Sequence, residues 1–167
     1  MKSLAVLLAF LAPPLHAAEA HICWRGANGY TMTGVLTYPD RLAGAELIDQ
    51  GQVEELRITG WLNGLMLGFW TSADVTPETS WQLWYSPREG RFPLIGSGIY
   101  QAWNADGAVD DCGSPGFGFN AGNSGQDICV DGVFVTASTI AWDTPILTYG
   151  RARDPLDCSN APLMSKG

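Results

Sequence analysis

The chain has 167 residues, with 17 acidic and 9 basic side chains and a formal net charge of −8 at neutral pH. This balance argues against nucleic-acid binding and against an anionic membrane surface, because both depend on basic side chains that meet phosphates. The length suits one domain that can bury a core of its own.

Residues 1–20 have the organisation of a secretory signal peptide. Lys2 supplies a positive start, residues 4–15 form an apolar run, and residues 18–20 (Ala-Glu-Ala) match a cleavage site. The run is too short to span a bilayer. We therefore predict that residues 21–167 form a single β domain. We expect it to be secreted or periplasmic, without membrane insertion after cleavage.

All four cysteines lie after this leader: Cys23, Cys112, Cys129 and Cys158. An even count in an exported chain predicts two disulfides, and four cysteines allow three pairings. We favour Cys112–Cys129, which closes a glycine-rich loop, and Cys23–Cys158, which ties the two ends together. In the entropic description the long loop stabilises the fold by about 4–5 kcal/mol.

Short runs rich in Val, Ile, Thr, Trp and Tyr alternate with turn residues, and the chain holds 20 glycines and 10 prolines. Helical periodicity is almost absent. This pattern predicts an all-β fold, an antiparallel β-sandwich or open barrel with Gly-rich loops and two disulfides. In chain order we expect strands at residues 30–38, 56–62, 65–71, 81–85, 99–103, 128–137 and 145–149. The connecting segments 43–54 and 104–127 and the tail at 155–167 are predicted to be loop-like.

The clearest element is a hairpin around Asn63-Gly64, a dipeptide that favours a two-residue turn with positive φ at both positions. A regular register would place Leu62 opposite Leu65, Ile58 opposite Phe69 and Arg57 opposite Trp70. One face, predicted to face the core, then carries Leu56, Ile58, Leu62, Leu65, Leu67 and Phe69. The second face carries Arg57, Thr59, Trp61, Met66 and Trp70, and is too aromatic for an ordinary solvated surface.

Seven tryptophans make aromatic side chains the main functional indication. Aromatic rings stack on sugars and contribute large contact areas at protein interfaces, but they also fill small β cores. The candidate ligand-binding residues are Trp61, Trp70, Trp84 and Arg57. Arg57 and Trp70 could instead form a cation–π pair on the sheet surface.

We expect no cofactor, but one acidic segment offers a possible calcium site. Residues 104–107 (Asn-Ala-Asp-Gly) match the middle of a calcium-binding loop, but positions 102 and 113 lack the acidic side chains of an EF-hand. The sequence leaves two interpretations open, a solvated acidic loop or a looser calcium site. The candidate ligands of that site are Asp106, Asp110, Asp111 and Asp127.

Catalytic signals are weak. The chain has two histidines, one of them in the predicted leader, which argues against triads that use histidine as a base. A glycoside hydrolase would need two acids about 5–10 Å apart across a cleft. The candidate acids are Glu54, Glu55, Glu78, Glu89 and Asp143. Their spacing in the sequence does not identify any two of them as a pair across a cleft.

Several stretches resemble a group of exported bacterial β domains, many of which carry a C-terminal sorting tail of the PEP-CTERM kind. The matching segments are residues 33–38, 42–51, 58–64, 103–104 and 112–119. The resemblance implies an exported all-β fold and no particular activity. Residues 161–167 lack the hydrophobic anchor and basic cluster of such a tail.

The sequence therefore predicts a secreted or periplasmic, non-catalytic β domain that binds a glycan or an extracellular protein surface through exposed aromatic side chains. Two alternatives are a small extracellular glycoside hydrolase that uses two carboxylates and a purely structural surface or matrix module.

Overall fold

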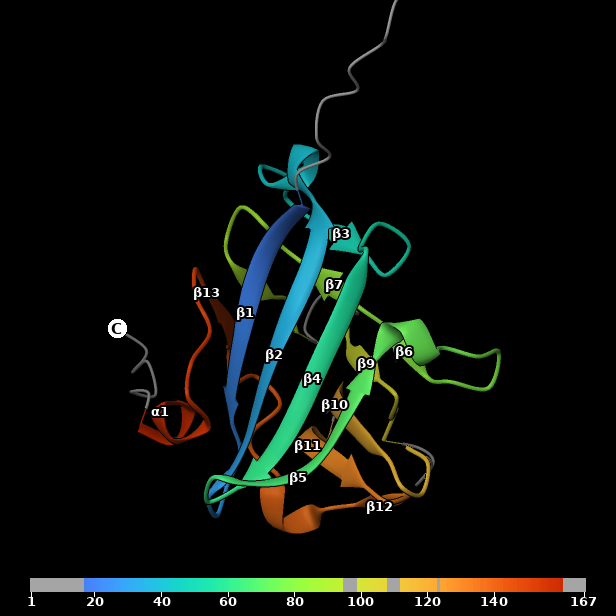
Figure 1. The fold of residues 1–167 in the computed structure, drawn as a ribbon, viewed down its shortest axis with the longest axis vertical. Coiled ribbons are helices and arrows are strands. Elements are labelled where there is room, and N and C mark those ends of the chain that lie inside the picture. Colours follow the sequence, from blue (N-terminus) through green and yellow to red (C-terminus); the bar gives the residue numbers. More distant parts are fainter. Residues whose placement is uncertain (1–16, 95–98, 108–111, 123, 161–167) are drawn as a thin grey trace, which may run out of the picture.

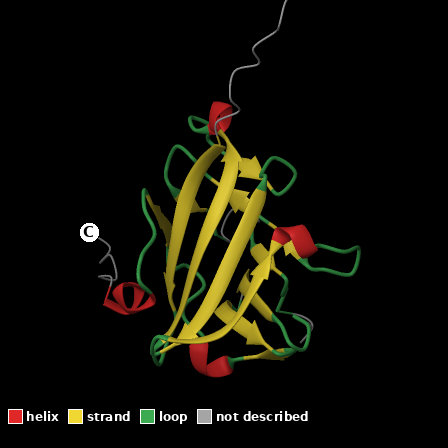
Figure 2. Cartoon of the chain, in the orientation of Figure 1, coloured by secondary structure: helices red, strands yellow, loops and turns green. Residues whose placement is uncertain are grey.

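A computed structural model describes residues 17–94, 99–107, 112–122 and 124–160. About half of this part is β-strand, all strand pairs are antiparallel, and the sheets do not close into a barrel (Figure 2). The predicted fold class, an antiparallel sandwich or open barrel with two disulfides, is confirmed.

The first sheet has six strands, and its long strands run side by side across the front of Figure 1. Its order is β5 (Leu65–Thr71), β4 (Glu55–Leu62), β2 (Tyr30–Pro39), β1 (Ala17–Arg25), β13 (Ile146–Tyr149) and β8 (Arg91–Phe92). β5 is therefore an edge strand.

The second sheet lies behind the first. Its order is β12 (Val133–Phe134), β11 (Gly125–Val130), β10 (Phe117–Gly122), β9 (Gln101–Trp103) and β6 (Trp81–Gln82). A two-stranded sheet pairs β3 (Ile48–Asp49) with β7 (Trp84–Tyr85). The helical pieces are η1 (Asp40–Leu42), η2 (Ser72–Asp74), η3 (Thr136–Ser138) and α1 (Pro155–Asn160).

A continuous chain of aromatic rings joins the two sheets through the core. Adjacent ring centroids are 4.9–5.7 Å apart, in tilted or edge-on arrangements that suit aromatic pairs. The rings are, in order, Tyr38, Tyr85, Phe92, Trp103, Phe119 and Trp24. Burial is the main reason that the pKa of Tyr38 is raised to about 12.

Two predicted segments differ in the structure. Residues 81–85 form two short strands in different sheets, β6 and β7, separated by the fully buried Leu83. The predicted loop at 104–127 contains β10, an inner strand of the second sheet. Its glycines weaken the strand signal, yet Gly118 is required there, because a Cβ would lie 2.6 Å from the carbonyl oxygen of Asn104.

Both predicted disulfide pairings are confirmed, with Cα–Cα distances of 5.3 Å for Cys23–Cys158 and 6.0 Å for Cys112–Cys129. Where a loop-like tail was predicted, residues Pro155–Asn160 form the short helix α1. Cys158 ties this helix to β1, and α1 packs beside β1 and β2. Tertiary contacts and the disulfide thus order a segment whose sequence has little helical periodicity.

Strand β1 overlaps the predicted leader. It begins at Ala17, and its first four residues pair with Leu36–Pro39 of β2. Ala20 is buried in the core. Cleavage after Ala20 would leave the second half of β1, from His21 to Arg25, in the sheet, and the signal peptide stays a prediction.

Candidate functional site

The β4–β5 hairpin begins as predicted and then departs from the regular register. Asn63 and Gly64 have φ of 50° and 83°, as the two-residue turn requires. Leu62 pairs with Leu65 and Trp61 with Met66, but Gly60 pairs with Gly68. Leu67 is therefore an extra residue in β5, a β-bulge.

The bulge reverses the faces of every later residue in β5, because side chains alternate along a strand. Ile58 pairs with Trp70, so the predicted pairings of Ile58 with Phe69 and of Arg57 with Trp70 are wrong. Trp70 is 6% exposed and packs against Trp81 in the second sheet at 5.5 Å between ring centroids. Phe69, predicted to face the core, is 67% exposed.

Two glycines allow the hairpin to lie directly on the second sheet. Gly60 and Gly68 are paired, and both face Phe117 of β10. A Cβ on Gly60 would lie 2.5 Å from Phe117 Cζ and closer still to Cε2, and one on Gly68 would lie 3.1 Å from Phe117 Cβ. Because Phe117 is fully buried and cannot move aside, this contact sets the distance between the β5 edge and β10.

The outer face of the hairpin carries Arg57, Trp61, Met66 and Phe69. Trp61 is half-buried, and its Nε1 donates a hydrogen bond of 2.9 Å to Thr33 Oγ1. Arg57 is exposed and forms an ion pair of 2.9 Å with Glu55. The ion pair replaces the predicted cation–π contact, because Thr71 is the residue opposite Arg57.

The apolar side chains that are most exposed on this hairpin belong to β5. Leu65, next to the turn, is 75% exposed although it was predicted to face the core, and Met66 is 61% exposed. With Phe69, three of the seven residues of β5 are large, apolar and exposed. Within the described residues, α1 packs mainly beside β1 and β2, and its Leu156 lies against Gly64 in the turn before β5.

Trp84 lies away from this hairpin. It is half-buried on β7, in the two-stranded sheet. Gln101 holds its backbone, because the Trp84 N–H donates to Gln101 Oε1 and Gln101 Nε2 donates to the Trp84 carbonyl, both at 3.0 Å. Of the four predicted ligand-binding residues, the structure therefore brings only Arg57 and Trp61 together on one exposed face.

Sequence reasoning placed Met66 beside Trp61 on this face, and the pairing of these two residues is confirmed, but it missed Phe69, which it placed on the core face. The available signal was the pair of glycines inside two strand-like runs, at positions 60 and 68. A glycine inside a strand indicates a bulge or a close backbone approach, and both occur here.

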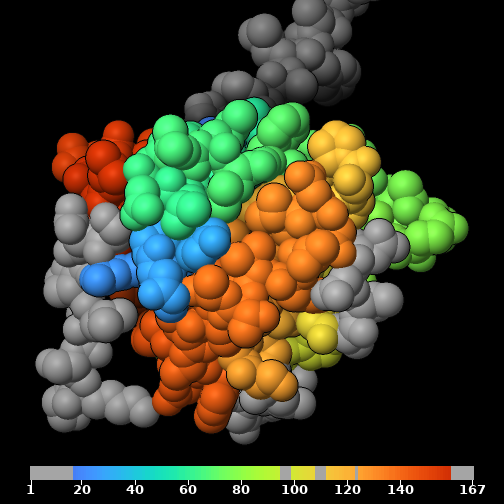
Figure 3. All heavy atoms as spheres, turned by 90° about the horizontal axis from the view of Figure 1, so that it is seen from below, coloured from blue at the N-terminus to red at the C-terminus, as the bar shows by residue number. Residues whose placement is uncertain are grey.

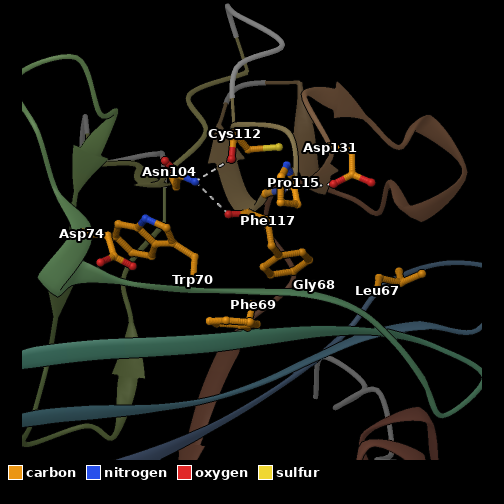
Figure 4. A pocket seen from close by; sticks show the side chains of 11 residues that line it. Leu67, Gly68, Phe69, Trp70, Asp74, Asn104, Cys112, Pro115, Phe117 and Asp131 are labelled. Atoms are coloured by element: carbon orange, nitrogen blue, oxygen red, sulfur yellow. Dashed lines mark hydrogen bonds between the residues drawn. The ribbon is translucent and has the colours of Figure 1, made fainter.

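A cavity of about 400 Å³ opens along the free edge of β5. Figure 4 shows Asp74 and Asp131 on opposite sides of it, with Trp70, Pro115 and Phe117 between them. Seen from below in Figure 3, atoms of the hairpin (green) lie against those of the second sheet (orange). The described residues that line the cavity include these two carboxylates and no basic side chain.

Hydrogen bonds hold the floor of the cavity in place. Asn104 Nδ2 donates to the carbonyl oxygens of Cys112 and Phe117, both at 2.9 Å. The Gly116 N–H donates to Asp131 Oδ1 at 3.0 Å, which leaves the other carboxylate oxygen of Asp131 for further contacts. The disulfide from Cys112 ties the same loop to β11.

None of the five predicted catalytic acids lines this cavity. Glu55 accepts hydrogen bonds from the Thr71 hydroxyl and from Arg57. Both bonds lower the pKa of the Glu55 carboxyl group, and the bond from Thr71 has the larger effect. A general acid needs a raised pKa. Glu89 forms an ion pair with Arg91.

The predicted calcium ligands are placed only in part, because Asp110 and Asp111 lie outside the described residues. Asp127 is half-buried on β11 opposite Asn120, whose Nδ2 donates to Asp127 Oδ1 at 3.4 Å. Burial raises the pKa of Asp127. Asp106 lies just after β9, and the described part of the chain holds no group of three or more His, Cys, Asp or Glu arranged for a metal ion. Calcium binding stays a prediction.

Comparisons with protein-family models, curated proteins and solved structures find no match to this chain. Among the described residues, no helix has the length and apolar character needed to cross a bilayer.

Proposed function

We propose that this chain is an exported, non-catalytic β domain that binds another macromolecule through its β4–β5 hairpin. The observation that carries the proposal is the group of exposed apolar side chains on β5, Leu65, Met66 and Phe69. Single exposed apolar residues are ordinary on protein surfaces, but three on one edge strand indicate an interaction site.

The chemistry of this surface favours a protein ligand over a glycan. Leu65 and Met66 are flexible aliphatic side chains that adapt to an apolar partner but offer no flat ring for a sugar. Trp61 is half-buried and its indole N–H is already bonded to Thr33, while Trp70 lies in the core. Phe69 is left as the exposed ring of the hairpin.

Export is supported by the leader-like start and by two disulfides, since such bonds persist in oxidising compartments. The resemblance to exported bacterial β domains agrees with it. A hydrolase would need one of the cavity carboxylates, Asp74 or Asp131, to act as an acid. Asp131 already accepts a backbone N–H of the loop, which favours a structural and binding role.

The experiment is site-specific photo-cross-linking in the exported protein. A benzophenone amino acid replaces Phe69, and in a matched control it replaces Val133, which is similarly exposed but lies on β12 in the other sheet. We expect protein adducts from position 69 only. Equal adducts at both positions, or none at 69, would refute binding through the hairpin, and adducts that a glycosidase digests would favour the glycan.

A further inference from the structure

The free edge of β5 has the features of a template for another strand. β5 pairs only with β4 in the described part of the chain, so its other side presents unpaired backbone N–H and C=O groups. Its seven residues include no charge and no proline, the usual devices that block edge pairing. The bulge at Leu67 lies near the turn, and Gly68 to Thr71 keep a regular register with β4.

Building on the proposed function, we propose that this edge binds an extended peptide segment of another protein as an added strand, with apolar and basic side chains alternating along it. The backbone of β5 would supply the hydrogen bonds, and the two faces of the edge would select the side chains.

The two faces of the added strand meet different chemistry. On the outer side, the strand would lie beside Met66 and Phe69, which are exposed and apolar. On the inner side, its alternate side chains would point toward the cavity between Asp74 and Asp131. A side chain with an apolar stem and a cationic end fits there, because Trp70 and Phe117 form the floor and carboxylates stand at both sides.

Charge also favours a foreign segment over a second copy of this chain. β5 itself contains no basic residue, so a copy of β5 could not place a cation between Asp74 and Asp131. The whole chain carries a net charge of −8, which repels a second copy and attracts a basic partner.

The test uses a fluorescein-labelled, end-blocked heptapeptide, Val-Lys-Val-Lys-Val-Lys-Val, titrated against the exported chain by fluorescence anisotropy. Three control peptides isolate each part of the inference. One replaces every Lys by Glu, one keeps the composition but groups the lysines at one end, and one carries N-methyl groups on alternate residues. We expect the alternating basic peptide to bind about tenfold more tightly than each control.

Variants of the chain locate the site. Asp74→Asn and Asp131→Asn should each weaken binding about two- to fivefold. Asp40→Asn removes the same charge from the exposed η1 segment, at the other end of the sandwich, and should leave affinity unchanged. Amide hydrogen exchange should slow in Leu65–Thr71 on binding and stay constant in Arg91–Phe92, the opposite edge of the same sheet.

Each result decides the matter. Equal binding of the alternating and grouped peptides, or equal effects of Asp40→Asn and Asp74→Asn, would mean that charge alone attracts the peptide, and the added strand would be refuted. The same holds if no peptide binds or if the chain dimerises through β5. If cross-links still form at position 69 in that case, the hairpin binds a partner in another way, and the proposed function survives.

Discussion

The contact between Gly60 and Phe117 supports the sharpest prediction about stability. Gly60→Ala would place a methyl group 2.5 Å from Phe117 Cζ, far inside van der Waals contact. Phe117 is fully buried, so the ring cannot turn into solvent, and either β4 or the core must shift. Overpacking of this kind costs typically 1–3 kcal/mol, and the severity of the clash places it at about 3 kcal/mol or more. For a chain of this size that lowers the melting temperature by about 6–12 °C.

The assay is urea unfolding followed by tryptophan fluorescence, with Gly44→Ala as the matched control. Gly44 has no atom within 4 Å of its added methyl group, so the same substitution should be neutral or stabilise the fold by up to about 1 kcal/mol. In a Phe117→Leu background the cost of Gly60→Ala should fall by at least about 1 kcal/mol, because the colliding ring is gone. A Gly60→Ala protein as stable as the Gly44→Ala protein would refute the close packing of the hairpin on β10.

Three further outcomes are expected. Replacing Cys23 and Cys158 by serine should lower the free energy of unfolding by about 4–5 kcal/mol in the entropic description, measured by urea titration. Asp127→Asn should raise the melting temperature at pH 7, and the gain should vanish below about pH 3. The sign follows from burial, which raises the pKa of Asp127 in the folded state above its usual 3.8. The cost of keeping the carboxylate charged in the fold therefore appears as the pH rises above 3.8. A gain of equal size at pH 3 and pH 7 would contradict this reasoning. The intact mass of the exported protein should show whether processing ends after Ala20, as predicted, or leaves more of β1 in place.

Local chemistry explains which parts of the fold the sequence could predict. Asn63 and Gly64 both adopt the positive φ that these two residue types tolerate, so the turn follows from two residues alone. Cys112 and Cys129 are 17 residues apart and are joined across the β10–β11 hairpin, while Cys23 and Cys158 pair across 135 residues because the first and last elements lie together. β10 was missed because its Gly118 is required by the close backbone of Asn104, a neighbour in space that no sequence pattern reveals.

The candidate site shows most clearly where prediction from the sequence fails. The sequence by itself determined the β class, the acidic character and the hairpin turn, since each depends on composition or on adjacent residues. Only the tertiary structure decided that Phe69 faces outward and Trp70 inward, because one extra residue at Leu67 reverses the alternation of β5. It also decided that Asp74 and Asp131, 57 positions apart in the numbering, stand on opposite sides of one cavity. Contacts between sheets bring such residues together, and no local pattern in the chain encodes them.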